Sequence, residues 1–392
     1  MSLDPAAITK AHIDSLGPEA LAKAASYTTG SHWLLLWGFV VAVIVTLLFV
    51  KLHLLDRVDT RLARRGWALR TFLLCAMFFL VSAILTLPWD IYSDWVREAA
   101  YDRTSQPLGD WLAQAAISTV VTALFGGLFF LGIYALIRRT GKRWWVWTGG
   151  LAAVAISALL LLSPIIIEPL FNDYRPLAAG PVRDALVVQA REAGIAPDRI
   201  LVFDGSRQSN NFTANVSGIG SSARIAISDV ALGKASLDEV RAVTGHEIGH
   251  YVEGHIWYAV VMFSLLAVLI FFLADRLYAR AARLFGSDAA IGEARGFPVM
   301  MILISFLGLF AMPIVNTVVR IDESSADLYS LKTVNLPDAM VGALLKSAEY
   351  RNPRPGTVEE WLFYDHPSVE RRMLMSMEWK AAHPKEAPAA KP

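Results

Sequence analysis

The stretch Ser236-Leu-Asp-Glu-Val-Arg-Ala-Val-Thr-Gly-His-Glu-Ile-Gly-His250 contains the pattern H-E-x-x-H. His246 and His250 are four residues apart, so on an α-helix they share one face and can bind one tetrahedral Zn²⁺. Glu247, beside the first histidine, can hold the water that such a metal activates. The stretch therefore predicts a helix that carries a zinc peptidase site, in preference to two surface histidines on an ordinary helix.

The residues just downstream exclude one class of zinc site. A metzincin would have a glycine at position 253 and a histidine at position 256, where this chain has Glu253 and Ile256. His255 is one residue out of register. Because a fifth residue along a helix faces about 140° away, we interpret it as a helix-end histidine rather than a ligand.

A better third ligand lies further along, in the segment Arg320-Ile-Asp-Glu-Ser-Ser-Ala-Asp327. Glu323 and Asp327 are again four residues apart on one helical face. The first could bind zinc, and the second could accept the remaining N–H of a ligand histidine. If Glu323 is not the ligand, Asp327 or Asp322 becomes the candidate.

Composition indicates that this motif belongs to a membrane protein. Hydrophobic residues make up 55% of the 392 residues and charged residues only 18%. Six apolar stretches approach or exceed the length of about 20 residues that a helix needs to cross a bilayer. They are 33–50, 67–87, 115–137, 145–167, 256–273 and 297–319. We therefore expect a mainly α, polytopic membrane fold in the cell membrane, with the lipid bilayer as its main surroundings.

The apolar stretches divide the chain into six parts. We expect an N-terminal polar segment (1–32), a four-span transmembrane domain (33–171), the first part of a zinc-protease domain (172–255), a two-span hairpin (256–319), the second part of the zinc-protease domain (320–380) and a disordered tail (381–392). Two spans separate the two polar sections, so both lie on the same side of the membrane. His246, His250 and Glu323 can therefore converge.

Local patterns predict a small α+β unit in the first polar section. Residues 181–193 have helical periodicity, and 199–204 and 224–228 alternate as strands do. A capping box, Ser236-x-x-Glu239, starts the metal-binding helix. The single cysteine, Cys75, lies in the second span, which excludes disulfides and thiolate metal sites.

Five motifs together resemble those of the type I CaaX prenyl endopeptidases and their bacterial relatives, which are integral-membrane zinc proteases. The resemblance covers most of the chain from about residue 67 onward. The motifs are Leu87-Pro88-Trp89-x-x-Tyr92, Ile167-Glu-Pro-Leu-Phe171, His246-Glu-x-x-His250, Glu323-x-x-x-Asp327, and His366-Pro367 with Arg372.

The resemblance implies one Zn²⁺ bound by His246, His250 and Glu323, the ligand set of a gluzincin, with Glu247 as catalytic base. It places His366 and Arg372 near the substrate; from the residues alone, Arg372 is also a natural partner for an acid such as Asp327. It further implies a helical barrel around a large intramembrane chamber, capped by the zinc domain. Eukaryotic members have seven spans. The apolar stretches of this chain predict about six, or seven if one more lies near the N-terminus.

One motif of the family is altered in this chain. Members typically have Asn-Ala at the start of a strand that faces the substrate, where this chain has Thr213-Ala214-Asn215. The asparagine is displaced from its usual place. The strand can still pair with an extended substrate backbone through main-chain hydrogen bonds.

The short loops on one side of the predicted membrane fold are rich in lysine and arginine. These loops, 51–66, 138–143 and 274–296, contain Lys51, Arg57, Arg61, Arg64, Arg65, Arg138, Arg139, Lys142, Arg143, Arg276, Arg280, Arg283 and Arg295. The opposite short loop, 89–114, has only Arg97 and Arg103 among several acids. The positive-inside rule then places the basic loops in the cytoplasm and the zinc domain on the outer or periplasmic face, opposite to the eukaryotic family.

Three functions remain open at this point. The first is an active membrane zinc endopeptidase. The second is an intramembrane-cleaving protease of the site-2 kind, but its H-E-x-x-H would lie within an apolar span, whereas this motif follows Asp238, Glu239 and Arg241. The third is a catalytically silent membrane scaffold or transporter, for which Pro164 and Pro313 within the spans are the only indications.

The partner of such an enzyme is a peptide or protein, which need not be soluble. A chamber could accept a prenylated C-terminal peptide, but an outward zinc domain favours quality control of membrane or exported polypeptides instead. The net charge of +1 gives no sign of a nucleic-acid partner. The oligomeric state does not follow from the sequence.

Overall fold

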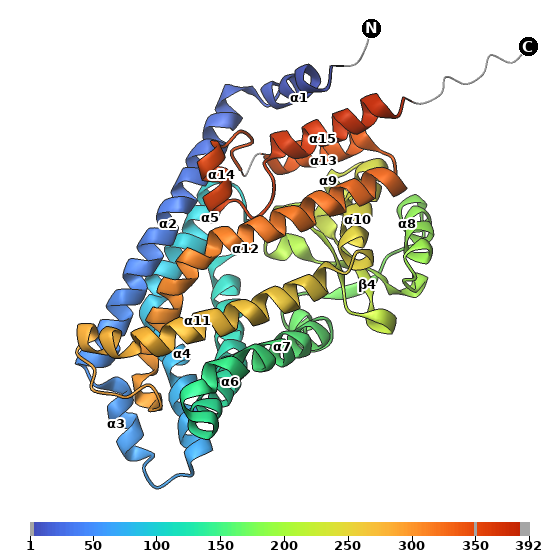
Figure 1. Ribbon diagram of the computed structural model, residues 1–392. Coiled ribbons are helices and arrows are strands. Elements are labelled where there is room, and N and C mark those ends of the chain that lie inside the picture. Colours follow the sequence, from blue (N-terminus) through green and yellow to red (C-terminus); the bar gives the residue numbers. More distant parts are fainter. Residues whose placement is uncertain (1–3, 349–350, 385–392) are drawn as a thin grey trace, which may run out of the picture.

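Long helices dominate the computed structural model, which describes residues 4–348 and 351–384 (Figure 1). The six expected spans correspond to α2 (Gly17–Lys51), α4 (Trp67–Ile91), α6 (Leu108–Thr140), α7 (Trp144–Leu162), α11 (His255–Phe285) and α12 (Phe297–Thr333). The expected span 145–167 extends beyond α7 into a π-helical segment, Ser163–Ile167. By length and composition, five continuous helical stretches of the described chain could cross a membrane. One of them, Leu108–Leu170, contains both α6 and α7, which are joined by a turn at Gly141–Arg143 and pack against each other. The six expected spans thus correspond to six helices.

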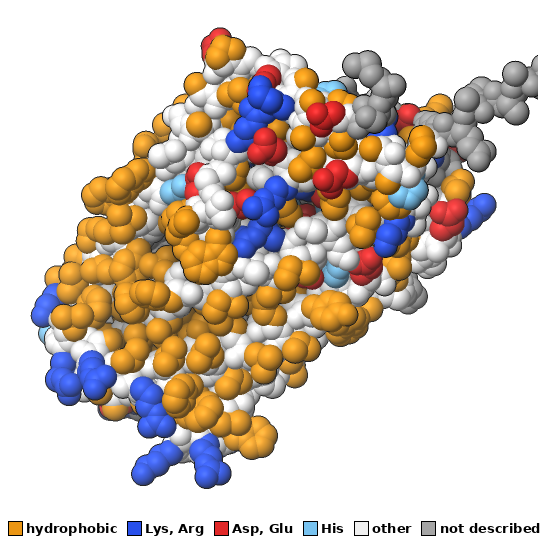
Figure 2. Space-filling view, turned by 45° about the horizontal axis from the view of Figure 1, so that its top comes forward, with side chains coloured by type: hydrophobic (Ala, Val, Ile, Leu, Met, Phe, Trp, Pro, Cys, Tyr) orange, Lys and Arg blue, Asp and Glu red, His pale blue; other side chains and the backbone are white. Residues whose placement is uncertain are grey.

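These six helices form a ring. Each packs against the next in the order α2, α4, α6, α7, α11, α12, and α12 packs against α2 again. In the apolar parts of these helical stretches, only 6% to 33% of the residues are buried, so most side chains face outward or into the ring. Hydrophobic side chains cover a broad band of the surface, with lysine and arginine gathered beyond one end of it (Figure 2). The arrangement confirms the expected helical membrane barrel.

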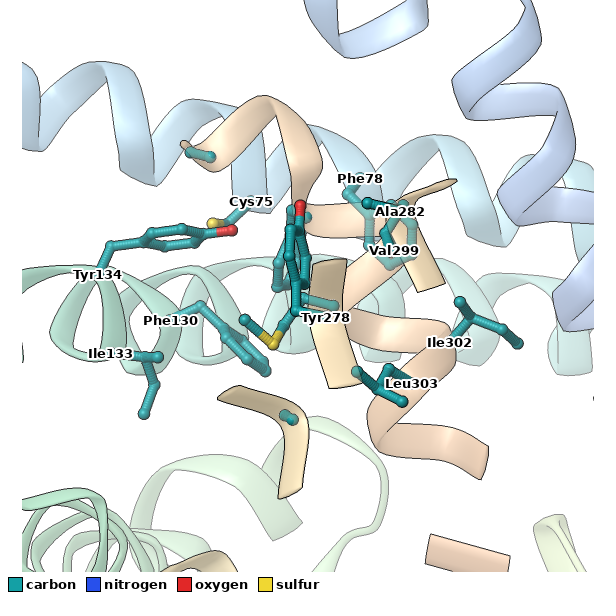
Figure 3. Packing of buried hydrophobic residues seen from close by; sticks show 14 of the residues in the cluster. Cys75, Phe78, Phe130, Ile133, Tyr134, Tyr278, Ala282, Val299, Ile302 and Leu303 are labelled. Carbon is teal, nitrogen blue, oxygen red and sulfur yellow. The ribbon is translucent and has the colours of Figure 1, made fainter. Parts of the chain in front are cut away.

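A packed hydrophobic cluster fills the ring at the end where α11 is followed by α12. Phe297, the first residue of α12, is fully buried at its centre. Its ring contacts those of Phe78 and Phe130 edge-on, with centroids 5.0 Å and 4.6 Å away. Tyr134 and Tyr278 belong to the same cluster (Figure 3). Helices α2, α4, α6, α7, α11 and α12 all contribute to it, so the cluster closes this end of the ring.

Shorter helices continue the ring helices at both ends. α1 (Pro5–Asp14) precedes α2, α3 (Leu54–Arg61) follows it, and α5 (Arg97–Ala100) extends α4 through a π-helical segment, Tyr92–Val96. α1 has ten residues and is too short to cross a bilayer. Among the residues from 4 onward that precede α2, no further span was found. α11 continues to Phe285, so part of the predicted loop 274–296 is helical.

The first polar section forms a small α+β unit. It contains β1 (Tyr174–Pro176), α8 (Pro181–Glu192), β2 (Ile200–Phe203), β3 (Ala214–Ser217), β4 (Arg224–Ser228), α9 (Asp229–Lys234) and α10 (Leu237–Val252). The strand order is β1-β2-β4-β3, with β2 and β4 parallel and the two outer strands antiparallel to their neighbours. The predicted helix at 181–193 and the predicted strands at 199–204 and 224–228 are confirmed. The strand β3 lies at an edge of the sheet, and α10 packs against it.

The second polar section adds three helices beside this unit, namely α13 (Pro337–Ala348), α14 (Thr357–Phe363) and α15 (Val369–Ala382). α13 packs against α10, and α15 packs against α13 and α1, around the buried side chains of Met340 and Met373. α15 includes the first two residues of the expected disordered tail. Residues 385–392 of that tail lie outside the described residues.

Candidate active site

The helix α10 begins where its sequence predicts. The hydroxyl of Ser236 accepts a hydrogen bond from the backbone N–H of Glu239 (3.3 Å), and the Glu239 carboxylate accepts one from the backbone N–H of Ser236 (2.7 Å). The predicted capping box is therefore present. Lys346 of α13 donates a hydrogen bond to the same carboxylate (2.6 Å), which fixes the start of α10 to the second polar section.

Two glycines allow α10 and α12 to approach each other closely. A Cβ atom added to Gly249 would lie 3.0 Å from the Cα of Ala326 and 3.1 Å from the Cβ of Tyr329. A Cβ atom at Gly245 would lie 2.8 Å from the hydroxyl of Ser330. The glycines are four residues apart and immediately precede the two histidines of the motif. Their missing side chains bring the histidines of α10 next to the carboxylates of α12.

Three side chains converge at this contact. Ligand atoms of His246, His250 and Glu323 all lie within 4.8 Å of one another. The two Nε2 atoms are 3.2 Å apart, and each is 3.3 Å from an oxygen of the Glu323 carboxylate. Glu323 is only 6% exposed, and its Oε2 atom has no hydrogen-bond partner. Three electron-pair donors that face one another in a buried space fit a cation between them, and two imidazoles with one carboxylate fit Zn²⁺.

A buried ion pair lies behind the first histidine. Asp327, which is 1% exposed, has its Oδ1 atom 2.8 Å from the Nδ1 atom of His246. Arg372, from α15, donates two hydrogen bonds of 2.7 Å to the same carboxylate. Both positions agree with the expectations from sequence: Asp327 accepts the N–H of a candidate ligand, and Arg372 is the partner of Asp327.

Glu247 lies beside this cluster but takes no part in it. Within the described chain, no hydrogen bond or ion pair of its carboxylate is seen. Desolvation by burial raises the pKa of Glu247 above its ordinary value. A half-buried carboxylate with a raised pKa and no fixed partner in the described chain takes up a proton more readily than an ordinary glutamate.

His366 lies on the other side of the cluster. Its Nε2 atom is 3.2 Å from Glu323, and its Nδ1 atom is 2.9 Å from Asp365. Its side chain is 38% exposed and lines a cavity of about 280 Å³ together with Arg372 and Tyr364. Through His366 and Arg372, the cavity therefore adjoins the cluster and the ion pair behind it.

Comparison with known proteins identifies the family of this chain. Residues 176–380 match peptidase family M48. The chain belongs to peptidase family M48. Residues 4–173 match the CAAX prenyl protease N-terminal region, described as having five membrane helices, where this M48 protein has four long ones. The resemblance to the type I CaaX proteases is therefore confirmed, and the protein is a multi-pass membrane metallopeptidase.

Similar M48 proteins occur in bacteria and eukaryotes. The metalloprotease YhfN of Bacillus subtilis is 28% identical over 299 residues, which are 75% of this chain and 70% of that protein. CAAX prenyl protease 1 of Saccharomyces cerevisiae is 27% identical over 359 residues, 86% of this chain and 76% of that protein. The crystal structure of S. mikatae Ste24p superposes with a TM-score of 0.75 at 21% identity, covering 93% of this chain and 90% of that one. At that identity the superposition shows a shared fold.

The altered strand motif lies at the sheet edge in this M48 protein. Ala214 and Asn215 belong to β3, and Thr213 directly precedes it. The side-chain oxygen of Asn215 is buried without a hydrogen-bond partner. Asn211 was not foreseen: it lines the cavity beside His366, and its side-chain oxygen is also buried without a partner. It lies two residues before Thr213, and no spacing rule singles it out.

Sequence reasoning missed two further features of the M48 site. The first is the glycine pair of α10, for which the signal was the four-residue repeat of Gly-His in Gly245-His246-Glu247-Ile248-Gly249-His250. The second is the position of His255. α10 ends before this residue, so the helical angle of about 140° does not apply to it.

Proposed function

We propose that this M48 protein is a zinc-dependent endopeptidase in which His246, His250 and Glu323 hold one Zn²⁺ and Glu247 is the general base. The single observation that carries the proposal is the convergence of two imidazole nitrogens and a buried, unpartnered carboxylate oxygen. Family membership supports the metal and the reaction class.

The proposed chemistry assigns one task to each side chain. When bound, the metal supplies Lewis-acid chemistry: it acidifies a water and polarises a peptide carbonyl. Glu247 accepts the proton from that water and passes it to the leaving amine, and its raised pKa helps it to hold the proton in between. His366, which reaches the same cavity, donates its N–H to the negative charge that develops on the carbonyl oxygen.

The substrate is proposed to bind as an added strand. The outer edge of β3 has free main-chain groups, and an extended peptide can pair with them, with or without a contact from Asn215. Because α10 packs against β3, a peptide on this edge passes close to the metal-binding helix. The two sections 172–255 and 320–380 would then act together as one zinc-protease unit.

The experiment that tests this function measures zinc content and peptide cleavage together. Glu247→Gln should retain zinc and lose nearly all activity, because the glutamate is not a ligand. Replacing His246, His250 or Glu323 by alanine should remove both metal and activity.

The neighbouring acid provides the matched control, since Asp322→Ala should keep both metal and activity. Equal loss of metal in Glu247→Gln would contradict its role as base. A full zinc equivalent in Glu323→Ala would transfer the third ligand to Asp327 or Asp322.

The substrate class follows from the orientation in the membrane. The positive-inside rule favours an outward zinc domain, and with it cleavage of membrane or exported polypeptides as quality control. The similarity to CAAX prenyl protease 1 favours prenylated peptides instead. Cleavage of a prenylated CaaX peptide and of the same peptide without its prenyl group separates these: equal rates support quality control, and cleavage of the prenylated form alone supports the second class.

A further inference from the structure

The chain makes a sharp break just after the second histidine of the motif. α10 ends at Val252 and α11 begins at His255, and between them Gly254 has a φ of +72°, in the left-handed region that favours glycine. This break turns His255 back toward the metal-binding helix. Its ring packs edge-on against that of His250, with centroids 4.9 Å apart and planes at 74°.

The hydrogen positions on the two rings follow from what each nitrogen faces. The Nε2 atom of His250 faces the cluster, and a nitrogen that binds a metal carries no hydrogen. The proton of a neutral His250 therefore lies on Nδ1. That atom is 2.8 Å from the Nδ1 atom of His255, so His250 donates and His255 accepts.

The same reasoning continues outward. Since Nδ1 of His255 accepts, its proton lies on Nε2, which is 3.3 Å from the carboxylate of Glu253. That carboxylate also accepts a hydrogen bond from the hydroxyl of Ser325, two residues after Glu323 along α12. Each donor in this series has one acceptor, and the series ends on a charged group. His255 is only 8% exposed, so water competes little for the bond to His250.

We propose that His255 is a positioning residue that sets the tautomer and ring orientation of His250, as Asp327 does for His246. The proposal rests on the proposed zinc site. It gives the two histidine ligands different supports: a carboxylate paired with Arg372 behind one, and a second imidazole behind the other. Through Glu253 and Ser325 it also ties the end of α10 to the helix that carries Glu323.

Two substitutions at position 255 separate the hydrogen bond from packing. His255→Leu keeps a side chain in the buried space but removes the Nδ1 acceptor, so zinc affinity should fall by about 10 to 100-fold. His255→Asn keeps an acceptor oxygen near the place of Nδ1 and should restore most of the affinity. The measurements are the zinc Kd by competition with a chelator, and the d–d absorption spectrum of the Co²⁺-loaded full-length protein, which should change in His255→Leu.

The control is His383→Leu, which removes an exposed histidine at the end of α15 and should leave both readings unchanged. Thermal unfolding of the metal-free variants checks that each one folds. If His255→Leu does not fold, Glu253→Ala at the partly exposed helix end replaces it, with a smaller loss of zinc affinity expected in the same direction.

Wild-type zinc affinity and an unchanged Co²⁺ spectrum in folded His255→Leu, or in its replacement, would overturn the proposal. Equal weakening by leucine and asparagine would also overturn it, because packing alone would then explain the effect. A wild-type protein that binds no zinc at all would instead refute the proposed function.

Discussion

The carboxylate of Asp327 links the candidate ligand His246 to the buried guanidinium of Arg372, because it contacts both. We expect Asp327→Asn to weaken zinc affinity or kcat/KM by roughly 10 to 100-fold without abolishing binding. The amide oxygen can still accept the histidine N–H, but the buried Arg372 loses its counter-charge. Zinc content after dialysis against a chelator series, together with peptide cleavage rates, measures this.

The conservative change at Arg372 provides the control for that experiment. Arg372→Lys keeps the positive charge but removes the two-point contact with Asp327 and should have a milder effect than Asp327→Asn. An Asp327→Asn enzyme indistinguishable from the wild type would mean that the carboxylate has no role in the site.

How far the site could be predicted also differs residue by residue. A four-residue spacing on a helix fixes a shared face, whatever surrounds it. It therefore predicts that His246 lies beside His250 and that Glu323 lies beside Asp327. His255 was interpreted from the same periodicity, which fails once the helix stops. The break depends on a left-handed glycine whose neighbours give no separate signal in one sequence.

At the scale of elements, the contact between α10 and α12 determines whether the donors meet. We expect Gly249→Ala to destabilise the protein by about 1–3 kcal/mol and to weaken zinc binding, because the new methyl group overpacks against Ala326 and Tyr329. Thermal unfolding and zinc titration measure the two effects.

Gly308→Ala is the matched control, since it lies within α12 and a Cβ atom there meets nothing within 4 Å. It should be neutral or slightly stabilising. If Gly249→Ala behaves like Gly308→Ala, the two helices have room to spare and their close packing does not determine the site.

The elements themselves were predictable to very different degrees. Long helices follow from apolar length alone, because a bilayer imposes that length, and the strands β2 and β4 follow from alternation. The three-residue strand β1 has no such signature. It exists only because Arg175 and its neighbours meet β2, a contact set by the tertiary structure.

At the scale of the whole molecule, the prediction concerns the side of the membrane on which the zinc unit lies. With Cys75→Ala as background, Asp198→Cys places an exposed thiol on the zinc unit, and Ala290→Cys places one in the loop between α11 and α12. The basic loops favour a cytoplasmic location for position 290. A membrane-impermeant thiol reagent should therefore label position 198 in intact cells and position 290 only after the membrane is opened.

Labelling of both positions after permeabilisation controls for access to each thiol. The reverse pattern in intact cells would place the zinc unit in the cytoplasm, as in the eukaryotic family. A cytoplasmic zinc unit could not cleave polypeptides after their export.

The aromatic cluster around Phe297 has a consequence for the cell as well as for the fold. A ring of six helices that was open to water at both ends could conduct ions and dissipate the membrane potential. Side chains from all six helices pack together in this cluster at one end of the ring, and close packing of that kind opposes a continuous file of water. We therefore expect the protein not to make the membrane permeable to ions, and we expect substrate and products to enter and leave on the zinc side or between the helices.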